Sequence, residues 1–177
     1  MNVLEKIKEV KNYYKKNYGI KLTKKQLKVL KSKDEIVRET FLRQEGCSTA
    51  AMIKAIEFAI NNERSTVLFI NVNRKISAMR IDDMKNMLSN KNLERHILSI
   101  TKNQGTINFI NGSQIKVISG NTISMIGLRA DCIIVEPIRI FNQDFINDLF
   151  YINAHSNRRQ TVLLNQVDLF NGQPINI

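Results

Sequence analysis

Residues 41–52, FLRQEGCSTAAM, join a predicted strand to a predicted helix, and this junction decides how the fold is interpreted. Gly46 comes just before Ser48 and Thr49, two hydroxyl residues of the kind that often begin a helix. The first backbone N–H groups of a helix lack partners within it, and the helix dipole favours an anion there. The junction therefore indicates a phosphate-binding turn or an ordinary helix cap. In the first case Ser48 or Thr49 could also bind a metal ion that bridges phosphates.

A loop of the P-loop form, GxxxxGK[ST], is only partly present at this junction. Gly46 and Ser48 stand at the second glycine and at the hydroxyl position. Cys47 stands where the lysine would be, and Phe41 where the first glycine would be. The motif alone leaves both interpretations open.

Strand and helix patterns alternate on either side of the junction. TVLFINV at 66–72 is a near-continuous apolar run, which is typical of a strand covered on both faces. Helical periodicity follows, and it places Ile76, Met79, Met84 and Met87 in the expected core. The full set comprises strands within 35–42, 66–72, 132–135 and 161–165, and helices at 48–61, 76–88 and 141–153. This alternation predicts an α/β fold with a mostly parallel sheet.

One pair of strands departs from the parallel pattern. TINFI at 106–110 and SQIKVIS at 113–119 flank Asn111 and Gly112. An Asn-Gly pair between alternating apolar residues is a strong hairpin signal. We therefore expect an antiparallel hairpin inserted into the sheet.

The charge is concentrated at the N-terminal end of the 177-residue chain. The formal net charge is +11, and residues 1–32 hold ten lysines against two acids. Helical spacing predicts an amphipathic helix from residue 3 and a second short helix at 23–31. The lysines are either an electrostatic arm for phosphates or a solvated helix face. Three tyrosines among them could stack on bases or pack against the body: Tyr13, Tyr14 and Tyr18.

Composition narrows the class of protein. With 43% hydrophobic and 24% charged residues, the chain is expected to be one globular domain. Its two cysteines, Cys47 and Cys132, are too few for a disulfide framework and suit a reducing cytoplasm. No apolar run approaches the roughly 20 residues needed to cross a bilayer. We expect an intracellular protein that makes no use of a membrane.

Five segments together resemble a known family. They are Gln26 in LTKKQLKVL, the loop from Arg43 to Thr49, Asn111-Gly112-Ser113 in the hairpin, Gly127, Asp131 and Glu136-Pro137 in IGLRADCIIVEP, and Asn165 at the end of TVLLN. In order and spacing they resemble the ATPase domain of the large terminase subunits of tailed phages, motors that pump DNA into procapsids. The resemblance covers roughly residues 20–166.

The resemblance implies a fold and its division. The fold is a P-loop NTPase of the RecA/ASCE type, a mostly parallel sheet flanked by helices with an inserted β-hairpin. A basic helical N-terminal segment at 1–34 would precede an ATPase core at 35–177. Only twelve residues follow Asn165, without an acidic cluster, so we expect no nuclease domain.

The resemblance also implies ligands and the roles of individual residues. ATP and Mg²⁺ are the implied cofactors. Gln26 would recognise adenine, and Ser48 and Glu136 would bind the metal. The implied nucleotide-binding set is Gln26, Arg43, Gln44, Glu45, Gly46, Cys47, Ser48 and Thr49. Glu136 is also the candidate catalytic residue, and Asn165 stands at the coupling position.

Both Walker motifs are degenerate at their reactive positions. Cys47 replaces the Walker A lysine, Glu136 replaces the Walker B aspartate, and Pro137 replaces the catalytic glutamate. Ile126 replaces the arginine of an Arg-Gly pair. A one-residue shift would move Glu136 to the catalytic position and Val135 to the metal position, so either alignment lacks one acid. Each lost group typically supplies roughly 10²–10⁴ in rate, so we expect ATP hydrolysis to be weak or absent.

Two functional hypotheses follow from the resemblance. The first is a terminase-like ATPase domain for viral DNA packaging, in the cytoplasm of a phage-infected host. Its implied partners are double-stranded DNA, portal or other packaging proteins, and further copies of itself. The alternative is a catalytically inactive terminase paralogue that acts as a DNA- or partner-binding module.

Other reactive residues give weaker signals. Cys47 would lie at a helix N-terminus near Arg43, and both features are expected to lower the pKa of its thiol. Neither histidine lies in a motif that would pair it with this thiol. Cys132 lies in an apolar strand and is expected to be an inert core residue.

Overall fold

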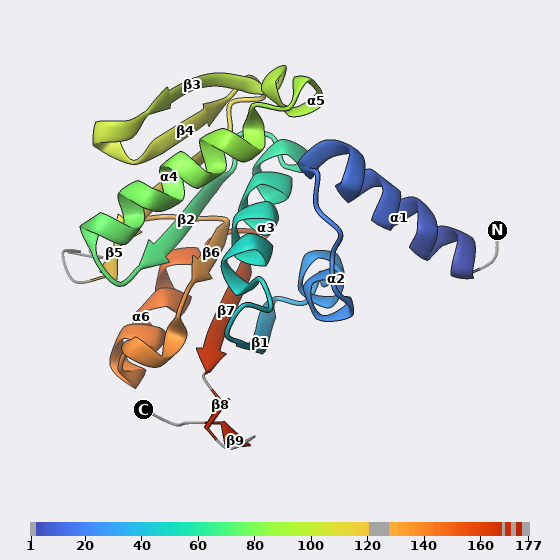
Figure 1. Cartoon of the computed structure of the whole chain (residues 1–177). Helices are drawn as coiled ribbons and strands as arrows, with labels where there is room; N and C mark the ends of the chain where they lie inside the picture. Colours follow the sequence, from blue (N-terminus) through green and yellow to red (C-terminus); the bar gives the residue numbers. More distant parts are fainter. Residues whose placement is uncertain (1–2, 121–127, 168, 171–172, 175–177) are drawn as a thin grey trace.

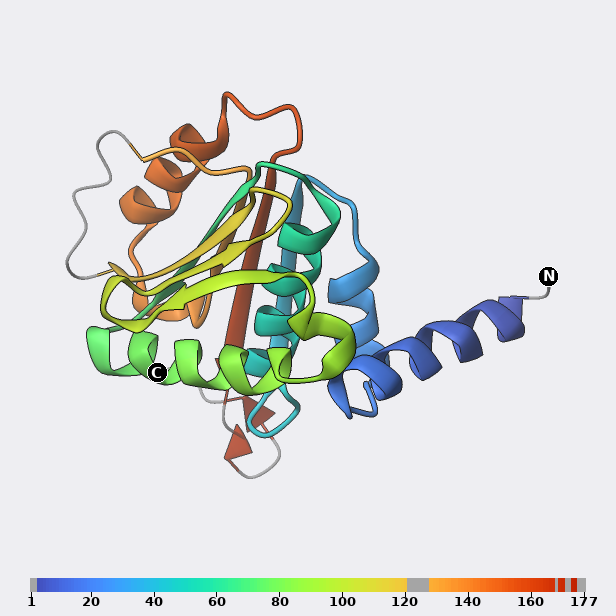
Figure 2. The same ribbon diagram turned by 90° about the horizontal axis from the view of Figure 1, so that it is seen from above.

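A seven-stranded sheet forms the centre of the molecule, and helices cover both of its faces (Figures 1 and 2). The computed structural model describes residues 3–120, 128–167, 169–170 and 173–174. The strands are β1 Ile36–Leu42, β2 Thr66–Asn71, β3 Ile97–Thr101, β4 Thr106–Phe109, β5 Gln114–Ser119, β6 Cys132–Val135 and β7 Gln160–Val167. Two short strands, β8 Leu169–Phe170 and β9 Gln173–Pro174, pair separately.

The strand order is β1-β7-β6-β2-β5-β4-β3. The neighbours from β1 to β5 pair in parallel, and β5-β4-β3 continue the sheet antiparallel. The predicted mostly parallel sheet with an inserted hairpin is therefore confirmed. β3 and the short helix that precedes it were not among the predicted elements.

The helices divide between the two faces of the sheet. They are α1 Val3–Tyr18, α2 Lys24–Lys31, α3 Cys47–Asn61, α4 Arg74–Leu88, α5 Lys91–Glu94 and α6 Gln143–Asn153, with 3₁₀ turns at Lys102–Gln104 and Ile138–Ile140. Alternate residues of β2 show the division, since Val67 and Phe69 pack on the side of α3 and α4. Leu68 and Ile70 pack on the side of α6. This two-sided burial explains the continuous apolar run of β2.

α4 buries part of the predicted stripe, since Met84 is fully buried and Met87 packs against the core. Ser77, Ile81, Met84 and Leu88 face the core at helical spacing. The placement of Met79 in the core is wrong, because this side chain is 53% exposed. The predicted and observed sets overlap at Met84 and differ in their other members, because apolar residues occur on more than one side of this helix.

The N-terminal segment packs on the same core as the sheet. Tyr14 and Tyr18 are buried there, together with Leu27 and Leu30 of α2. The Tyr18 hydroxyl donates to Glu57 of α3 over 2.6 Å. These two tyrosines therefore pack α1 against the body. The amino-terminal half of α1 projects away from the body (Figure 2). None of the described helices is both long and apolar enough to cross a bilayer.

The Asn-Gly hairpin is fastened to the far end of α3. The Asn111 side-chain amide donates to the carbonyls of Ala59 and Ile60, and the Ser113 hydroxyl also donates to Ala59. Gly112 takes a φ of 80° in this turn, a value that favours glycine. The hairpin therefore holds the carboxyl-terminal end of α3 in place.

Candidate functional site

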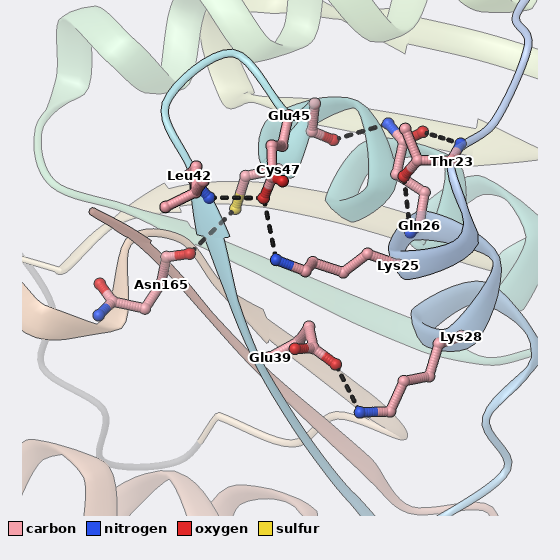
Figure 3. A network of polar contacts seen from close by, with 10 residues as sticks. Thr23, Lys25, Gln26, Lys28, Glu39, Leu42, Glu45, Cys47 and Asn165 are labelled. Carbon is pink, nitrogen blue, oxygen red and sulfur yellow. Dashed lines mark hydrogen bonds and ion pairs between the residues drawn. The ribbon is translucent and has the colours of Figure 1, made fainter. Parts of the chain in front are cut away.

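The turn between β1 and α3 is held in shape by local contacts (Figure 3). Gly46 is the N-cap of α3, with φ 78° and ψ 37°, and Gln44 also has a positive φ of 69°. The Glu45 carboxylate accepts from the Leu42 backbone N–H over 2.7 Å and from Lys25 over 2.9 Å. The backbone hydrogen bond and the Lys25 contact lower the pKa of Glu45. The carboxylate thus stays charged and closes the turn.

Gln26 braces the turn from α2. Its Nε2 donates to the Gly46 carbonyl over 3.0 Å, and its Oε1 accepts from the Thr23 backbone N–H over 2.8 Å. A Cβ at Gly46 would lie 2.2 Å from this Nε2, so any other residue there would displace the Gln26 side chain. The structure thus gives Gln26 a bracing contact in the turn, and its role toward adenine stays a prediction.

The first turn of α3 leaves backbone donors at this corner. Gly46 provides no side-chain cap, and the Ala50 N–H is the first that bonds back, to the Gly46 carbonyl. The three preceding amides belong to Cys47, Ser48 and Thr49. Uncapped donors at the positive end of a 15-residue helix favour an anion.

Cys47 is a buried, neutral residue of this turn. Its side chain is 3% exposed, and its Sγ lies 3.7 Å from the Asn165 backbone carbonyl. Burial raises the pKa of the thiol, Glu136 raises it further, and Arg80 offsets only part of the rise. The prediction of a lowered pKa is wrong, because burial of the thiol outweighs the helix N-terminus. Cys47 thus offers no charge to a phosphate.

Three side chains from three elements meet beside the first turn of α3. The Ser48 hydroxyl donates to the carboxylate of Glu136, the residue that follows β6. Arg80 of α4 donates to the Ser48 Oγ from Nη2 over 2.7 Å, and its Nε lies 3.5 Å from the Glu136 carboxylate. Glu136 is 3% exposed, so Arg80 compensates a buried charge. We call Ser48, Glu136 and Arg80 the corner cluster.

Sequence reasoning brought Ser48 and Glu136 to the site but missed Arg80. Arg80 belongs to none of the recognised motifs, and it lies directly before the buried Ile81. Its one local signal is Asp83, with which it pairs at 3.2 Å across one helical turn. The contact with Ser48 depends on how α4 packs beside α3, which no local pattern reveals.

A buried amide lies at the same edge of the sheet. Asn71 ends β2 and is fully buried, and within the described residues neither of its side-chain atoms has a hydrogen-bond partner. Strand alternation puts Asn71 on the face of Phe69, and it puts Glu136 on the face of Ile134, which is the same face. β2 and β6 are paired neighbours, so Asn71 and Glu136 stand side by side.

Asn165, the predicted coupling residue, meets the turn through its backbone. Its carbonyl faces Cys47, as Figure 3 shows. Asn165 is two residues after Leu163 in β7, so strand alternation puts its side chain on the same face of the sheet, the face that α6 covers. Its buried Oδ1 has no hydrogen-bond partner among the residues described.

A groove opens beside the corner cluster, between α3 and α4. Its volume is about 390 Å³, and it is lined by Ser48, Thr49, Met52, Arg80, Asp83, Asn86 and Met87. A larger hollow of about 660 Å³ lies between α4 and β5 and includes none of the predicted site residues. We take the smaller groove as the one that belongs to the site, because it contacts the uncapped end of α3.

The remaining motif residues lie outside the corner cluster, and the described ones make other hydrogen bonds. Arg43 is exposed, and its backbone N–H bonds to the Val167 carbonyl. Asp131 lies at the opposite end of β6 from Glu136 and accepts from the Thr66 N–H and the Ser156 hydroxyl. Ile126 and Gly127 fall outside the described residues. Within the described ranges, no three His, Cys, Asp or Glu side chains gather closely enough to hold a metal ion by themselves.

Comparison with known proteins gives a consistent answer at the level of structure. No protein-family model and no curated protein sequence matches the chain. Solved structures do match. The large terminase of bacteriophage HK97 has a TM-score of 0.72 at 12% identity, over 82% of this chain and 33% of that one. The large terminase ATPase domain of Thermus phage P74-26 has a TM-score of 0.68 at 13% identity, over 87% of this chain and 68% of that one.

A third likeness is to a structure with a bound nucleotide. The large terminase of another thermophilic bacteriophage, in complex with ADP, has a TM-score of 0.62 at 16% identity, over 81% of this chain and 38% of that one. This chain spans about a third of the length of the HK97 large terminase. The resemblance noted in the sequence is confirmed in the arrangement of helices and strands: this chain has the fold of the ATPase domain of phage large terminases.

Proposed function

We propose that the chain binds a nucleoside triphosphate with Mg²⁺ at the Gly46 turn, as a terminase-like domain in viral DNA packaging. The observation that carries this proposal is the corner cluster. It sets a hydroxyl from the first turn of α3 against a buried carboxylate at the end of β6, beside uncapped helix amides. The likeness to a thermophilic phage terminase in complex with ADP supports the choice of ligand.

The residues at the corner fit a magnesium ion held mainly by its nucleotide. Mg²⁺ prefers oxygen ligands and usually binds through one or two protein groups, phosphates and water. The Ser48 hydroxyl and the Glu136 carboxylate are two such oxygens in direct contact. This contact supports Glu136 at the metal position in preference to the catalytic one. A bound Mg²⁺ would neutralise phosphate charge at this corner.

Hydrolysis is proposed to be slow or absent. Pro137 follows Glu136 and has no group that could activate water. Cys47 is neutral at the position of the Walker A lysine. The proposed action of the domain is therefore nucleotide binding, with double-stranded DNA, portal or other packaging proteins and further copies of the chain as partners.

Nucleotide binding is tested by thermal shift with ATP·Mg²⁺. The wild-type protein should gain stability with rising ATP·Mg²⁺, because a ligand of the folded state raises Tm by mass action. Ser48→Ala should reduce the shift, and Cys47→Lys should enlarge it by adding a charge beside the phosphates. Absence of a shift in both the wild type and Cys47→Lys would refute the proposal.

Hydrolysis is tested separately by steady-state phosphate release with and without DNA. We expect turnover near background in the wild type. Turnover well above background that disappears in Ser48→Ala would show an active ATPase and would contradict the proposed loss of hydrolysis.

The alternative is an inactive paralogue that binds DNA or a protein partner. It is favoured by the exposed lysines of α1 at positions 8, 11, 15 and 16. Affinity for double-stranded DNA should then fall steeply with salt and should collapse when Lys8, Lys11, Lys15 and Lys16 are all replaced by alanine, a change that leaves the buried face of α1 in place. A flat response to salt would argue against this function.

A further inference from the structure

We propose that Arg80 is the cation that binds the terminal phosphate of the nucleoside triphosphate at the Gly46 turn. This inference rests on the proposed function of the same site. It assigns a charge to a corner where Cys47 is neutral and buried. The charge would come from the middle of α4 instead of the first turn of α3.

Arg80 lies between the other two residues of the corner cluster and the groove beside α3. Its guanidinium contacts the Ser48 hydroxyl at 2.7 Å and the Glu136 carboxylate at 3.5 Å. Its side chain is 18% exposed and lines the groove that Thr49 also lines. Arg80 thus lies between the buried carboxylate and a groove that opens at the uncapped end of α3.

Arg80 has N–H donors that its described contacts leave unused. A guanidinium has five N–H donors in a planar fork that matches phosphate oxygens. The described contacts use one donor on Asp83 and one on Ser48. The buried Nε has no hydrogen-bond acceptor among the described residues, although it faces Glu136. The second N–H of Nη1 and the second N–H of Nη2 therefore remain for a phosphate.

Asn71 supplies an independent indication of a ligand at this corner. Its fully buried amide has neither a donor nor an acceptor partner in the part of the chain described. An unsatisfied buried polar group costs about 1–3 kcal/mol, so such groups usually meet a polar partner. Asn71 stands beside Glu136 on the face of α3, where a phosphate oxygen or a water on the metal would satisfy it.

The charges of the corner fit this assignment. Glu136 alone would repel a triphosphate, and Arg80 compensates it. Because Arg80 contacts the two oxygens that would hold Mg²⁺, we expect its guanidinium to exchange them for phosphate oxygens when nucleotide binds. Phosphate binding by Arg80 and metal binding by Glu136 would then be coupled.

The test is isothermal titration of the whole chain with ATP·Mg²⁺ and with ADP·Mg²⁺. In Arg80→Gln, ATP should bind roughly 10- to 100-fold more weakly, the size expected for a lost charged hydrogen bond. The loss for ADP should be smaller if Arg80 meets the terminal phosphate of ATP. Arg74→Gln is the matched control, an exposed arginine on the same helix, and it should bind as the wild type does.

A rescue variant guards against a merely structural effect. Cys47→Lys combined with Arg80→Gln should regain affinity for ATP, because the lysine supplies charge from α3. Where Arg80→Gln fails to fold, Arg80→Lys is titrated instead, and it should weaken ATP binding by losing the planar fork. Equal ATP affinity in the wild type and the folded Arg80 variant would overturn this inference alone. Lack of ATP binding in both the wild type and Cys47→Lys would overturn the proposed function as well.

Discussion

Replacing Gly46 by alanine should damage the turn through two separable effects. The first is the backbone, since a φ of 78° costs a residue with a Cβ about 1–2 kcal/mol. The second is Gln26, whose Nε2 would lie 2.2 Å from the new Cβ. Moving Gln26 forfeits its bonds to Gly46 and Thr23, at roughly 0.5–1.5 kcal/mol each. The expected loss in the free energy of unfolding is therefore about 2–5 kcal/mol.

Gly19 offers a matched control for the backbone effect. It has a φ of 68°, and a Cβ there would meet nothing within 4 Å. Gly19→Ala should cost only the strain of about 1–2 kcal/mol. Urea unfolding of both variants then gives the contribution of Gln26 by difference.

A double-mutant cycle decides whether Gln26 is the group displaced. Gln26→Ala already forfeits both hydrogen bonds, so adding it to Gly46→Ala should cost little more than Gly46→Ala alone. Two losses that simply add in the double variant would refute the reasoning. So would equal losses for Gly46→Ala and Gly19→Ala.

Further predictions concern the packing around the site. Glu57→Gln should cost about 1–2 kcal/mol and speed amide exchange in α1, because Tyr13 and Tyr18 both donate to the Glu57 carboxylate; unchanged exchange in α1 would contradict this. Phe69→Ala should cost about 3–5 kcal/mol by urea unfolding, because this side chain is fully buried beneath α3 and α4; a loss below about 1 kcal/mol would be inconsistent with that packing. Burial raises the pKa of Cys132 to about 12, so the folded chain keeps a proton that the unfolded chain loses above about pH 9. The free energy of unfolding should therefore fall between about pH 9 and 12, by at most about 1.4 kcal/mol per pH unit from this thiol. The decline should be shallower in Cys132→Ala, and the same slope in both proteins would count against the raised pKa of Cys132.

Local patterns predicted most of the elements of this fold. The continuous apolar run of β2, the Gly46 turn and the Asn-Gly hairpin each carry their signal within a few residues. β3 escaped prediction because it is a short edge strand, and its Leu98 is 69% exposed. The order of the strands was beyond any local pattern, since it depends on contacts between distant segments.

At the candidate site, too, the sequence predicted residues that belong to motifs and missed a residue whose contacts depend on packing. Ser48 and Glu136 could be chosen from motifs, and the structure brings them into contact. Arg80 could not be chosen, because its contacts come from the packing of α4 beside α3. The pKa of Cys47 was predicted in the wrong direction, since the helix terminus is visible in the sequence and the burial of the thiol is not.

The attachment of α1 has a mechanical consequence. The helix has 16 residues and is about 24 Å long, and the buried Tyr14, Asn17 and Tyr18 lie in its last two turns. A change in how these residues pack that tilts the helix by about 10° would move its opposite end by about 4 Å. Such a change would move Lys8 farther than Lys15 and Lys16, which lie in the last turn of the helix.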